Sequence, residues 1–511
     1  MSKTDSRSEL NLRGPMALYS VALFAIVLLR NAWLCDDAYI VLRVVDNFVN
    51  GLGLIWNPGE RVQAFTNPLW TFLVSGIYFF SHEAFYTVIV LSAVVSLSAV
   101  SLFAFRIASS TTTVVLGILV LTMSKAFIDF SSSGLENPIT HLLLACFFLL
   151  YFQPELDRKR LILVSLIAGH GVLNRMDTIL LFAPPLVAAL MNFPKGGSDR
   201  LTAFGVFVLG FVPFIFWECF SLLYYGFPFP NTAYAKLDTG IGALDLVRQG
   251  LQYFLNSLAL DPLTVVAIAV GGVLPFITKD KKSRPASVGI ILYLLYILSI
   301  GGDFMSGRFF SAPLFCAVII LSQYRIKSRS AVAATAVAVT LLGMFRPNLW
   351  SMISKSDSGR TNTIDDKGIA DERQVYSKWS SLAQGRPSTN GSSHPWAVEG
   401  RFARLYGPRV VTRNAIGLFG YFAGPTVHVV DENGIADPLL ARMPTISDRG
   451  WRIGHFRRSI PEGYLESLEA RKNLIVDKTL ARYYDRLSII TKGEIFDSQR
   501  LEEVWKMNLG L

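Results

Sequence analysis

Cysteine is scarce in this chain. The 511 residues include four cysteines, which are scattered along the sequence, three of them inside apolar runs: Cys35, Cys146, Cys219 and Cys316. A disulfide framework or a cysteine-rich metal site needs cysteines at short, repeated spacings. The sequence therefore predicts neither of these.

Charged residues are also scarce. They make up 17% of the chain, whereas a soluble domain carries roughly a quarter. Hydrophobic residues make up 51%, and the mean hydropathy is +0.41. Apolar runs repeat between residues 15 and 349, each about 15 to 23 residues long, which suits a hydrocarbon core of about 30 Å. The composition excludes an ordinary soluble protein and predicts a polytopic α-helical membrane protein.

A signal-peptide cleavage site is missing behind the first apolar run. Lys3, Arg7 and Arg13 precede that run, but the sequence RNAWLCDD behind it is a poor cleavage site. We therefore expect a cytoplasmic N-terminus at residues 1–14, followed by an uncleaved first helix. From residue 350 onward the composition is that of a globular domain. We predict a transmembrane domain with outer-face loops at 15–349 and a soluble α/β domain at 350–511.

The orientation of the helices follows from the basic loops. Candidate spans lie at 15–34, 67–81, 84–105, 112–128, 138–152, 161–174, 177–192, 201–223, 262–278, 286–301, 308–324 and 330–348. Basic connections belong on the cytoplasmic side, which allows about 11 crossings if 67–105 is one crossing plus a shallow segment. The last helix then delivers the soluble domain to the outer side. The net charge of +10 reflects these loops and does not predict a nucleic-acid partner.

The segment behind the first span carries two adjacent carboxylates, Asp36 and Asp37. Polar residues then recur on one helical face through Arg43 and Asn50, while the opposite face is apolar. This pattern predicts a helix that lies flat at the membrane interface, with its polar face toward protein or water. The alternative is an amphipathic re-entry helix whose acids are merely solvated.

Four further polar segments are expected on the same outer side. They contribute Glu136 after SSSG, Arg175 and Asp177 in LNRMD, Asn231 and Lys236 in FPFPNTAYAKLD, and Asp303 and Arg308 in GGDFMSGRF. Each has a plainer interpretation: Glu136 could cap the next helix, and Arg175 and Asp177 could form an interfacial salt bridge.

Acids and cations gathered at one membrane surface suggest a chemistry. Cations at the headgroup level suit a lipid phosphate, and we assign this role to Arg175, Lys236 and Arg308. Carboxylates nearby suit general-base or nucleophilic work on a hydroxyl and an activated carbon. A phosphate-linked lipid substrate with a hydroxyl acceptor meets both demands. Further substrate contacts are expected from Arg43, Asp177, Asn231, Asp303 and, in the C-terminal part, His455.

These segments resemble a known family. The resemblance covers the chain from Asp36 to about Asp477. It rests on seven stretches: DDAYIVLRVVDNFVNGLGLIWNPGERVQAFTNPLW, SSSGLEN, LNRMD, FPFPNTAYAKL, GGDFMSGRF, NAIGLFGYFAGPTVHVVDENGIADPLLARMP and RIGHFRRSIPEGY. With them the chain resembles GT-C-type polytopic glycosyltransferases. Among these it is most similar to the bacterial terminal β-(1→2)-arabinofuranosyltransferases, a family also described as flagellar motor control proteins.

The resemblance implies a GT-C transmembrane catalytic domain and a polyprenyl-phosphate sugar donor, with D-arabinofuranose as the expected sugar. It implies transfer to a glycan or glycoprotein acceptor on the outer face of the bacterial cytoplasmic membrane. In such enzymes the acid of the first outer loop is catalytic, which is Asp36 here, with Asp37 beside it. Glu136 matches the acid of the second outer loop.

The residues leave the mechanism open. In an inverting reaction Asp36 would deprotonate the acceptor, whereas in a retaining reaction a carboxylate could attack the anomeric carbon. Arginines can stabilise the leaving phosphate without a metal, so we predict no obligatory metal or other cofactor. The acids could alternatively hold a divalent cation.

The C-terminal domain alternates strand and helix patterns. VHVVD, NLIVD and LSIIT are predicted strands, and KTLARYYDRL is a predicted helix. Residues 355–395 are expected to form a loop. The glycines of GLFGYFAG favour helix–strand packing over phosphate binding. His455 lies among arginines in RIGHFRR, where it either binds acceptor glycan or faces solvent.

Two competing functions remain. The first is a transporter or flippase for a lipid-linked sugar, and the only feature that favours it is Glu218 inside an apolar run. Such transporters usually contain internal repeats, and none is visible in this sequence. A non-catalytic envelope or flagellar-motor protein would explain a soluble domain but not the outer-face acids. Replacing Asp36 and Asp37 by asparagine in a transfer assay would separate these classes.

Overall fold

The computed structural model describes residues 3–154, 157–191, 199–237, 239–344, 364–384, 392–446 and 451–511. The chain forms two compact units, each built from separate stretches of sequence. The first unit comprises Met1–Leu34, Val88–Pro213 and Ala243–Gly385, and the second comprises Cys35–Thr87, Phe214–Gly242 and Arg386–Leu511. The predicted domain boundary between residues 349 and 350 lies outside the described residues.

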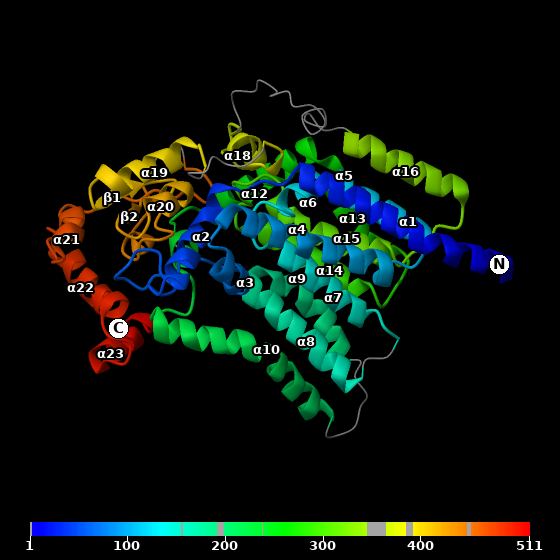
Figure 1. Ribbon diagram of the computed structural model, residues 1–511. Coiled ribbons are helices and arrows are strands. Elements are labelled where there is room, and N and C mark those ends of the chain that lie inside the picture. The colour runs from blue at the N-terminus through cyan, green and yellow to red at the C-terminus, as the bar shows by residue number, and fades with distance from the viewer. Residues whose placement is uncertain are drawn as a thin grey trace. The chain divides into compact units, whose positions relative to one another are not determined.

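The first unit consists of helices (Figure 1). Its elements are α1 (Lys3–Arg30), α4 (Ala84–Leu102, continued by the π-helical turn η1, Phe103–Ile107), α5 (Thr111–Met123), α6 (Lys125–Phe130), α7 (Asn137–Tyr151), α8 (Arg158–Asn174), η2 (Met176–Thr178), α9 (Ile179–Met191), the start of α10 (Asp199–Tyr224), α12 (Ala243–Leu260), α13 (Pro262–Ile277), α14 (Arg284–Ser299), η3 (Arg308–Phe310), α15 (Ser311–Leu321), α16 (Arg329–Met344), α18 (Glu372–Ser380) and η4 (Leu382–Gln384).

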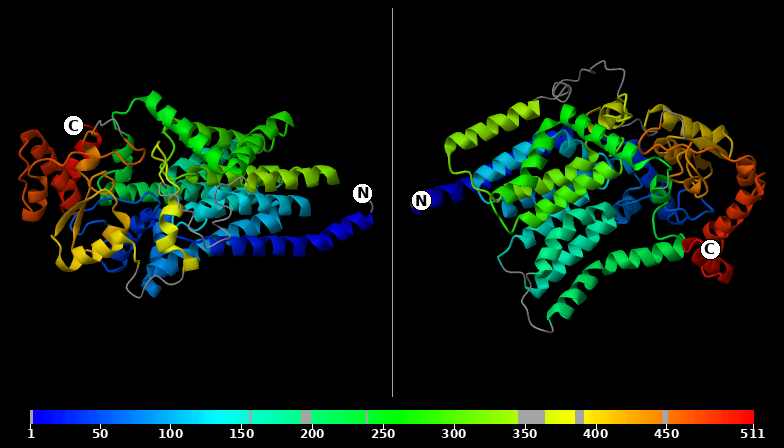
Figure 2. Two further views of the ribbon diagram at one scale, coloured as in Figure 1. Left: turned by 90° about the horizontal axis from the view of Figure 1, so that it is seen from above. Right: turned by 180° about the vertical axis from the view of Figure 1, so that it is seen from behind.

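Six of these helices close a ring of neighbours. Helix α7 packs on α8, α8 on α9, α9 on α14, α14 on α13, α13 on α15, and α15 returns to α7 (Figures 1 and 2). Small residues permit some of the close approaches in this unit. A Cβ atom on Gly169 of α8 would lie 2.4 Å from the carbonyl oxygen of Gly210 in α10. The ring matters for function because the ends of α7, α8, α9, α14 and α15 carry several predicted site residues.

Apolar helices cover most predicted spans. Among the described residues, three helical stretches are long and apolar enough to cross a membrane: Leu12–Arg30, Ala84–Ile107 and Phe204–Tyr224. The pair α12 and α13, bent by 113°, would make a fourth. The other predicted spans, except 161–174 in α8, correspond to apolar helices of 10–17 residues. The prediction of a mostly helical, multi-pass membrane protein is confirmed, while the count of 11 crossings stays a prediction.

The second unit combines helices with a small sheet. Its elements are α2 (Asp36–Val49), α3 (Pro68–Ser81), the end of α10, α11 (Asn231–Leu237), α19 (Pro395–Tyr406), β1 (Val410–Arg413), α20 (Gly417–Ala423), β2 (His428–Asp431), η5 (Leu440–Arg442), α21 (Tyr464–Ala470), α22 (Lys478–Lys492) and α23 (Ser498–Asn508). Strands β1 and β2 are parallel, with Val410 opposite His428 and Arg413 opposite Asp431. Helix α20 connects them as the crossover that parallel strands require.

Several sequence predictions for the C-terminal part need correction. VHVVD contains β2 as expected, but NLIVD is not a strand, and LSIIT lies within α22. Tyr484, Leu487 and Ile490 are buried at the three-residue spacing of a helix face, which overrides the strand propensity of their β-branched neighbours. The expected loop 355–395 contains helix α18, whose first turn is capped by Asp371. Of the residues in that expected loop, 364–384 and 392–395 are described, and the others lie outside the described residues.

Helix α12 (Ala243–Leu260) was missed because only one side of it is strongly apolar. That side is the exposed one, where Leu251 and Leu255 are 54% and 52% exposed, whereas Gly250, Tyr253 and Ser257 form the buried side. Such a helix is amphipathic and too polar to be recognised as a span.

Candidate catalytic and ligand-binding groups

The tandem aspartates begin helix α2, in the second unit. The Asp36 carboxylate accepts hydrogen bonds from the backbone N–H groups of Gly417 at 3.1 Å and Leu418 at 2.7 Å. These N–H groups belong to the start of α20, so Asp36 fixes one helix to the other. Burial raises the pKa of Asp36 to about 7, although the Leu418 N–H bond lowers it and Asp37 raises it further.

The two aspartates differ in exposure. Asp36 is 7% exposed, whereas Asp37 is half-buried. The alternative prediction of merely solvated acids is therefore wrong for Asp36. The residues of the predicted polar stripe also differ in exposure. Asn47 is 1% exposed, and its side chain donates to the carbonyl of Ile55 at 2.9 Å, whereas Asn50 is exposed.

Arg43 lies in the same polar stripe, and protein surrounds it. Its Nε donates to the Trp56 carbonyl at 2.9 Å, and its Nη1 to the Gly420 carbonyl at 2.6 Å. Nη2 donates to Asn57 Oδ1 at 3.1 Å and to the Val427 carbonyl at 2.8 Å. Burial lowers the pKa of Arg43 to about 9, which still leaves the side chain charged at neutral pH. These bonds join α2 to α20 and the loop before β2, and the predicted substrate contact of Arg43 stays a prediction.

Glu136 and two arginines meet in the first unit, at one end of the helix ring. Glu136 directly precedes α7 and is 1% exposed. Arg175, which follows α8, donates from Nη1 to Glu136 Oε1 at 3.1 Å. Arg308, which precedes α15, donates from Nη2 to the same oxygen at 3.2 Å. Three predicted outer-face segments are thus brought together by one carboxylate oxygen.

Two more carboxylates complete this buried ionic network. Asp177 accepts from Arg175 Nε and Nη2, both at 2.8 Å, and from the Tyr293 hydroxyl at 3.2 Å. Asp303 Oδ2 lies 3.6 Å from Arg308 Nη1. Burial would lower the pKa of Arg175, but Asp177, Tyr293 and Glu136 raise it well above its ordinary value. We call Glu136, Arg175, Asp177, Asp303 and Arg308 the ring-end network; its carboxylates outnumber its guanidinium groups.

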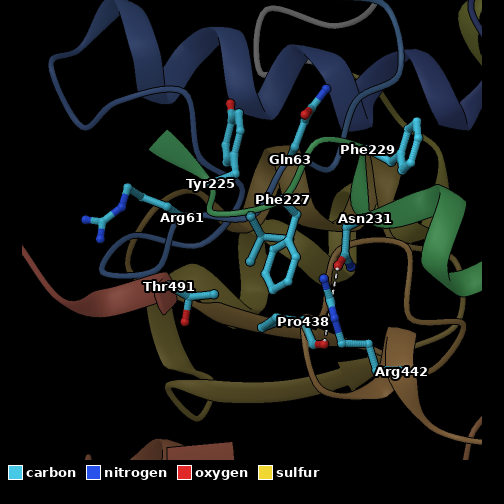
Figure 3. Close-up of a pocket in the computed structure, with 10 residues that line it drawn as sticks. Arg61, Gln63, Tyr225, Phe227, Phe229, Asn231, Pro438, Arg442 and Thr491 are labelled. Carbon is cyan, nitrogen blue, oxygen red and sulfur yellow. Dashed lines mark hydrogen bonds between the residues drawn. The ribbon is translucent and has the colours of Figure 1, made fainter. Parts of the chain in front are cut away.

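The predicted site residues of α11 fall into two environments. Asn231 is used by the fold, because its Nδ2 donates to the carbonyls of Gly434 at 2.8 Å and Asp437 at 3.0 Å. Arg442 Nη1 donates to Asn231 Oδ1 at 3.0 Å and to the Pro438 carbonyl at 2.9 Å (Figure 3). The cavity between these side chains is about 10 Å³, which is room for a single water at most.

Lys236, in the last turn of α11, lies near Arg452 and His455. Arg452 and His455 pair across a tight turn, and the His455 N–H donates to the Arg452 carbonyl at 2.9 Å. Burial and the nearby charges of Arg452 and Lys236 lower the pKa of His455 to about 3, so its ring is neutral. Arg458 ties this segment to α11 by donating to the Ala235 carbonyl. Two of the motifs that carried the family resemblance therefore meet around Lys236, Arg452 and His455, which we call the α11 cationic group.

The sequence did not reveal a second ionic cluster in the first unit. Lys125 forms ion pairs with Asp129 and, at 2.9 Å, with Asp371, and Arg373 Nε lies 3.8 Å from Asp129 Oδ1. The cluster ties α6 to the start of α18. The available signal was Lys125 and Asp129 at helical i, i+4 spacing inside an otherwise apolar stretch.

The predicted site residues divide between the units. The first unit contains the ring-end network. The second unit contains the other predicted site residues, which are Asp36, Asp37, Arg43, Asn231, Lys236 and His455. No group of three histidine, cysteine, aspartate or glutamate side chains suited to a metal ion occurs in the described part of the chain. Independence from a metal stays a prediction.

Comparisons with known proteins connect the chain to a class of enzyme. No family model matches the chain. It is 27% identical over 528 residues to the terminal β-(1→2)-arabinofuranosyltransferase of Mycobacterium tuberculosis, covering 85% of this chain and 82% of that protein. It is 22% identical over 515 residues to the enzyme of the same name from Corynebacterium glutamicum, covering 83% and 72%.

Among solved structures, the chain is similar to ArnT from Cupriavidus metallidurans bound to undecaprenyl phosphate. The identity is 14%, the TM-score is 0.47, and the similarity covers 81% of this chain and 85% of that one. The resemblance found in the motifs is confirmed by the two curated relatives: this chain is an enzyme of the glycosyltransferase class that resembles the terminal β-(1→2)-arabinofuranosyltransferases.

Proposed function

We propose that this protein transfers D-arabinofuranose from a polyprenyl-phosphate donor to a hydroxyl group of an envelope glycan or glycoprotein. The observation that carries the proposal is similarity over 85% of the chain to an enzyme named for β-(1→2)-arabinofuranosyl transfer. Long apolar helices support a membrane-embedded donor, since a polyprenyl chain is soluble only in lipid.

We place the reaction on the outer face of the bacterial cytoplasmic membrane, in a GT-C architecture of about 11 crossings with an extracytoplasmic C-terminal domain. The support comes from the distribution of basic loops in the sequence. It also comes from the ring-end network, because residues 136, 175, 177, 303 and 308 come from three segments that the charge pattern assigned to one side.

Within this function, we assign the catalytic base to Asp37 and a positioning role to Asp36. Both Asp36 oxygens accept backbone N–H bonds from α20, and the side chain is buried. Asp37 is more exposed and stands on the same first turn of α2. In an inverting reaction Asp37 takes the proton of the acceptor hydroxyl while that oxygen bonds to the anomeric carbon. The bond from the anomeric carbon to the phosphate oxygen breaks, and the polyprenyl phosphate leaves with its electron pair.

A retaining reaction uses the same groups differently. The carboxylate bonds to the anomeric carbon as the phosphate leaves with the electron pair of the broken bond. The acceptor oxygen then bonds to that carbon and displaces the carboxylate, while the hydroxyl proton passes to an oxygen of the released phosphate. The anomeric configuration of the product, compared with that of the donor by NMR, separates the two routes.

For the donor phosphate, we favour the α11 cationic group. Lys236 and Arg452 lie close to a neutral His455 that can still form hydrogen bonds to phosphate oxygens. Arg175 and Arg308 are the second choice; Glu136, Asp177 and Asp303 lie against them. A phosphate there would have to compete with three carboxylates. Lys236→Ala should raise the KM for the donor at least tenfold and leave the KM for the acceptor within twofold; the reverse pattern would contradict this assignment.

The experiment that tests the function is a transfer assay with the full chain in proteoliposomes, using a radiolabelled polyprenyl-phosphate arabinofuranose donor and an arabinan oligosaccharide acceptor. Asp37→Asn should lower kcat by at least 10²-fold, as expected for removal of a general base. Asp36→Asn should retain measurable transfer. Asp245→Asn, at a 55% exposed carboxylate, is the matched control and should transfer normally. Normal transfer by Asp37→Asn, with all variants folded, would refute the catalytic assignment.

A further inference from the structure

The second unit contains a groove that the proposed transfer reaction does not use. Its volume is about 980 Å³, within the range of pockets that enclose an organic ligand. Five segments line it: residues 58–60, 403–410, 425–428, 467–473 and 484–492. They come from the loop after α2, the α19–β1 connection, the start of β2, the end of α21 and one side of α22. We call this cavity the C-terminal groove.

The floor of the groove is built around a buried carboxylate. Glu60 is 3% exposed, and its Oε1 accepts from Asn57 Nδ2 at 3.2 Å. His428 Nε2 lies 3.7 Å from the same oxygen, and burial together with nearby cations lowers the pKa of His428 to about 3. Lys492 donates to the Tyr484 hydroxyl at 3.0 Å and lies over the Tyr484 ring. The floor therefore offers a buried carboxyl group, a neutral imidazole, an ammonium donor and an aromatic ring.

Ser488 stands on the side of α22 that lines the groove, and it is half-buried. Because its side chain is small, a large residue at this position would occupy part of the groove volume.

The lining of the groove carries charges of both signs. Five cations line it, namely Arg404, Arg409, Arg471, Lys472 and Lys492, together with three acids, Glu60, Glu469 and Asp485. The acids weaken the attraction of the cations for a polyanion, and the polar floor is unsuited to an acyl chain. Hydroxyl groups both donate and accept hydrogen bonds, so a polyhydroxylated ligand can use cations and carboxylates together.

We infer that the C-terminal groove binds an uncharged oligosaccharide along the surface of the second unit. If the proposed function holds, this oligosaccharide is the part of the acceptor chain that does not react; that identification rests on the proposed function, but the binding does not. Prolines at 58, 408 and 425 stiffen the groove wall. A stiff wall reduces the conformational entropy lost on binding.

The test is direct binding to the full chain in nanodiscs, without any donor. The probes are a neutral arabinofuranose hexasaccharide and a neutral glucose hexasaccharide, and binding is measured by saturation-transfer NMR and calorimetry. Ser488→Trp fills the groove and should weaken binding at least tenfold. Ser498→Trp, at an exposed position that does not line the groove, is the matched control and should change Kd less than twofold.

A second pair of variants guards against misfolding of Ser488→Trp. Lys472→Glu changes an exposed residue of the groove rim, whereas Lys478→Glu makes the same change at an exposed position outside it. We expect at least a threefold loss of affinity from the first and none from the second. The inference is overturned if neither hexasaccharide binds the wild-type chain, if Ser488→Trp binds normally, or if dextran sulfate or phosphatidylglycerol vesicles compete for the groove better than the sugars. Because no donor is present, these outcomes are independent of whether the chain transfers sugar.

Discussion

Replacing Glu136 by glutamine should destabilise the first unit, because one oxygen of this side chain accepts from two buried guanidinium groups. Arg175 and Arg308 donate to Oε1 at 3.1 and 3.2 Å, and their side chains are 12% and 14% exposed. A charge-assisted hydrogen bond contributes about 1.5–3 kcal/mol, against about 0.5–1.5 kcal/mol for a neutral one. Glutamine keeps the acceptor oxygen but removes its charge. The loss is therefore about 1–1.5 kcal/mol per bond, or about 2–3 kcal/mol in total.

The measurement is the thermal unfolding of the purified chain in detergent, followed by tryptophan fluorescence. A loss of 2–3 kcal/mol should lower Tm on the order of 5 °C. Glu432→Gln is the control, because Glu432 pairs with Arg457, whose side chain is 62% exposed. An exposed pair contributes at most about 1 kcal/mol, so its Tm should change little.

The result that refutes this reasoning is a Tm for Glu136→Gln equal to that of Glu432→Gln. In that case the ring-end network would not hold the helix ends together. If such a variant were also inactive in the transfer assay, Glu136 would act in the chemistry instead. A Tm loss with transfer preserved at low temperature would instead give Glu136 a structural role.

Further predictions follow from the second unit. Gly417→Ala should block folding or cost several kcal/mol, because its Cβ would lie 1.9 Å from the Asp36 backbone oxygen; Gly76→Ala, with open space around it, should be neutral or slightly stabilising by Tm. The folded-state pKa of Asp36 is raised from 3.8 to about 7, so the folded chain holds this proton more tightly than the unfolded chain, and stability should fall as pH rises from 4 to 7 and level off above. The pKa values of Asp431 and Asp437 are also raised to about 7 by burial, so the Tm of Asp36→Asn should still fall over this range, but by less than the Tm of the wild type. Arg43→Lys should lower Tm by several degrees, since lysine cannot reach the four acceptors that Arg43 contacts; an unchanged Tm would contradict that role.

The sequence predicted local structure well wherever the pattern was strong. The apolar runs predicted at 138–152, 161–174 and 262–278 correspond to α7, α8 and α13, because each run is hydrophobic over several turns and ends at charged or proline residues. Amphipathic α12 was missed, and LSIIT was misassigned, because these segments depend on what packs against them. The pairing of Arg175 with Asp177 was also visible, since the two residues are close in sequence.

The sequence by itself determined that this protein is a multi-pass membrane protein with acids and arginines at the ends of its helices, because apolar length and charge placement are local properties of the chain. Only the tertiary structure decided which groups each of these residues contacts. Glu136 and Arg308 share a hydrogen bond across 172 positions, and Asp36 is fixed by the N–H groups of Gly417 and Leu418, more than 380 positions away. Burial and hydrogen-bond partners of this kind arise when distant segments pack together, and they distinguish the buried carboxylate of Asp36 from its more exposed neighbour Asp37.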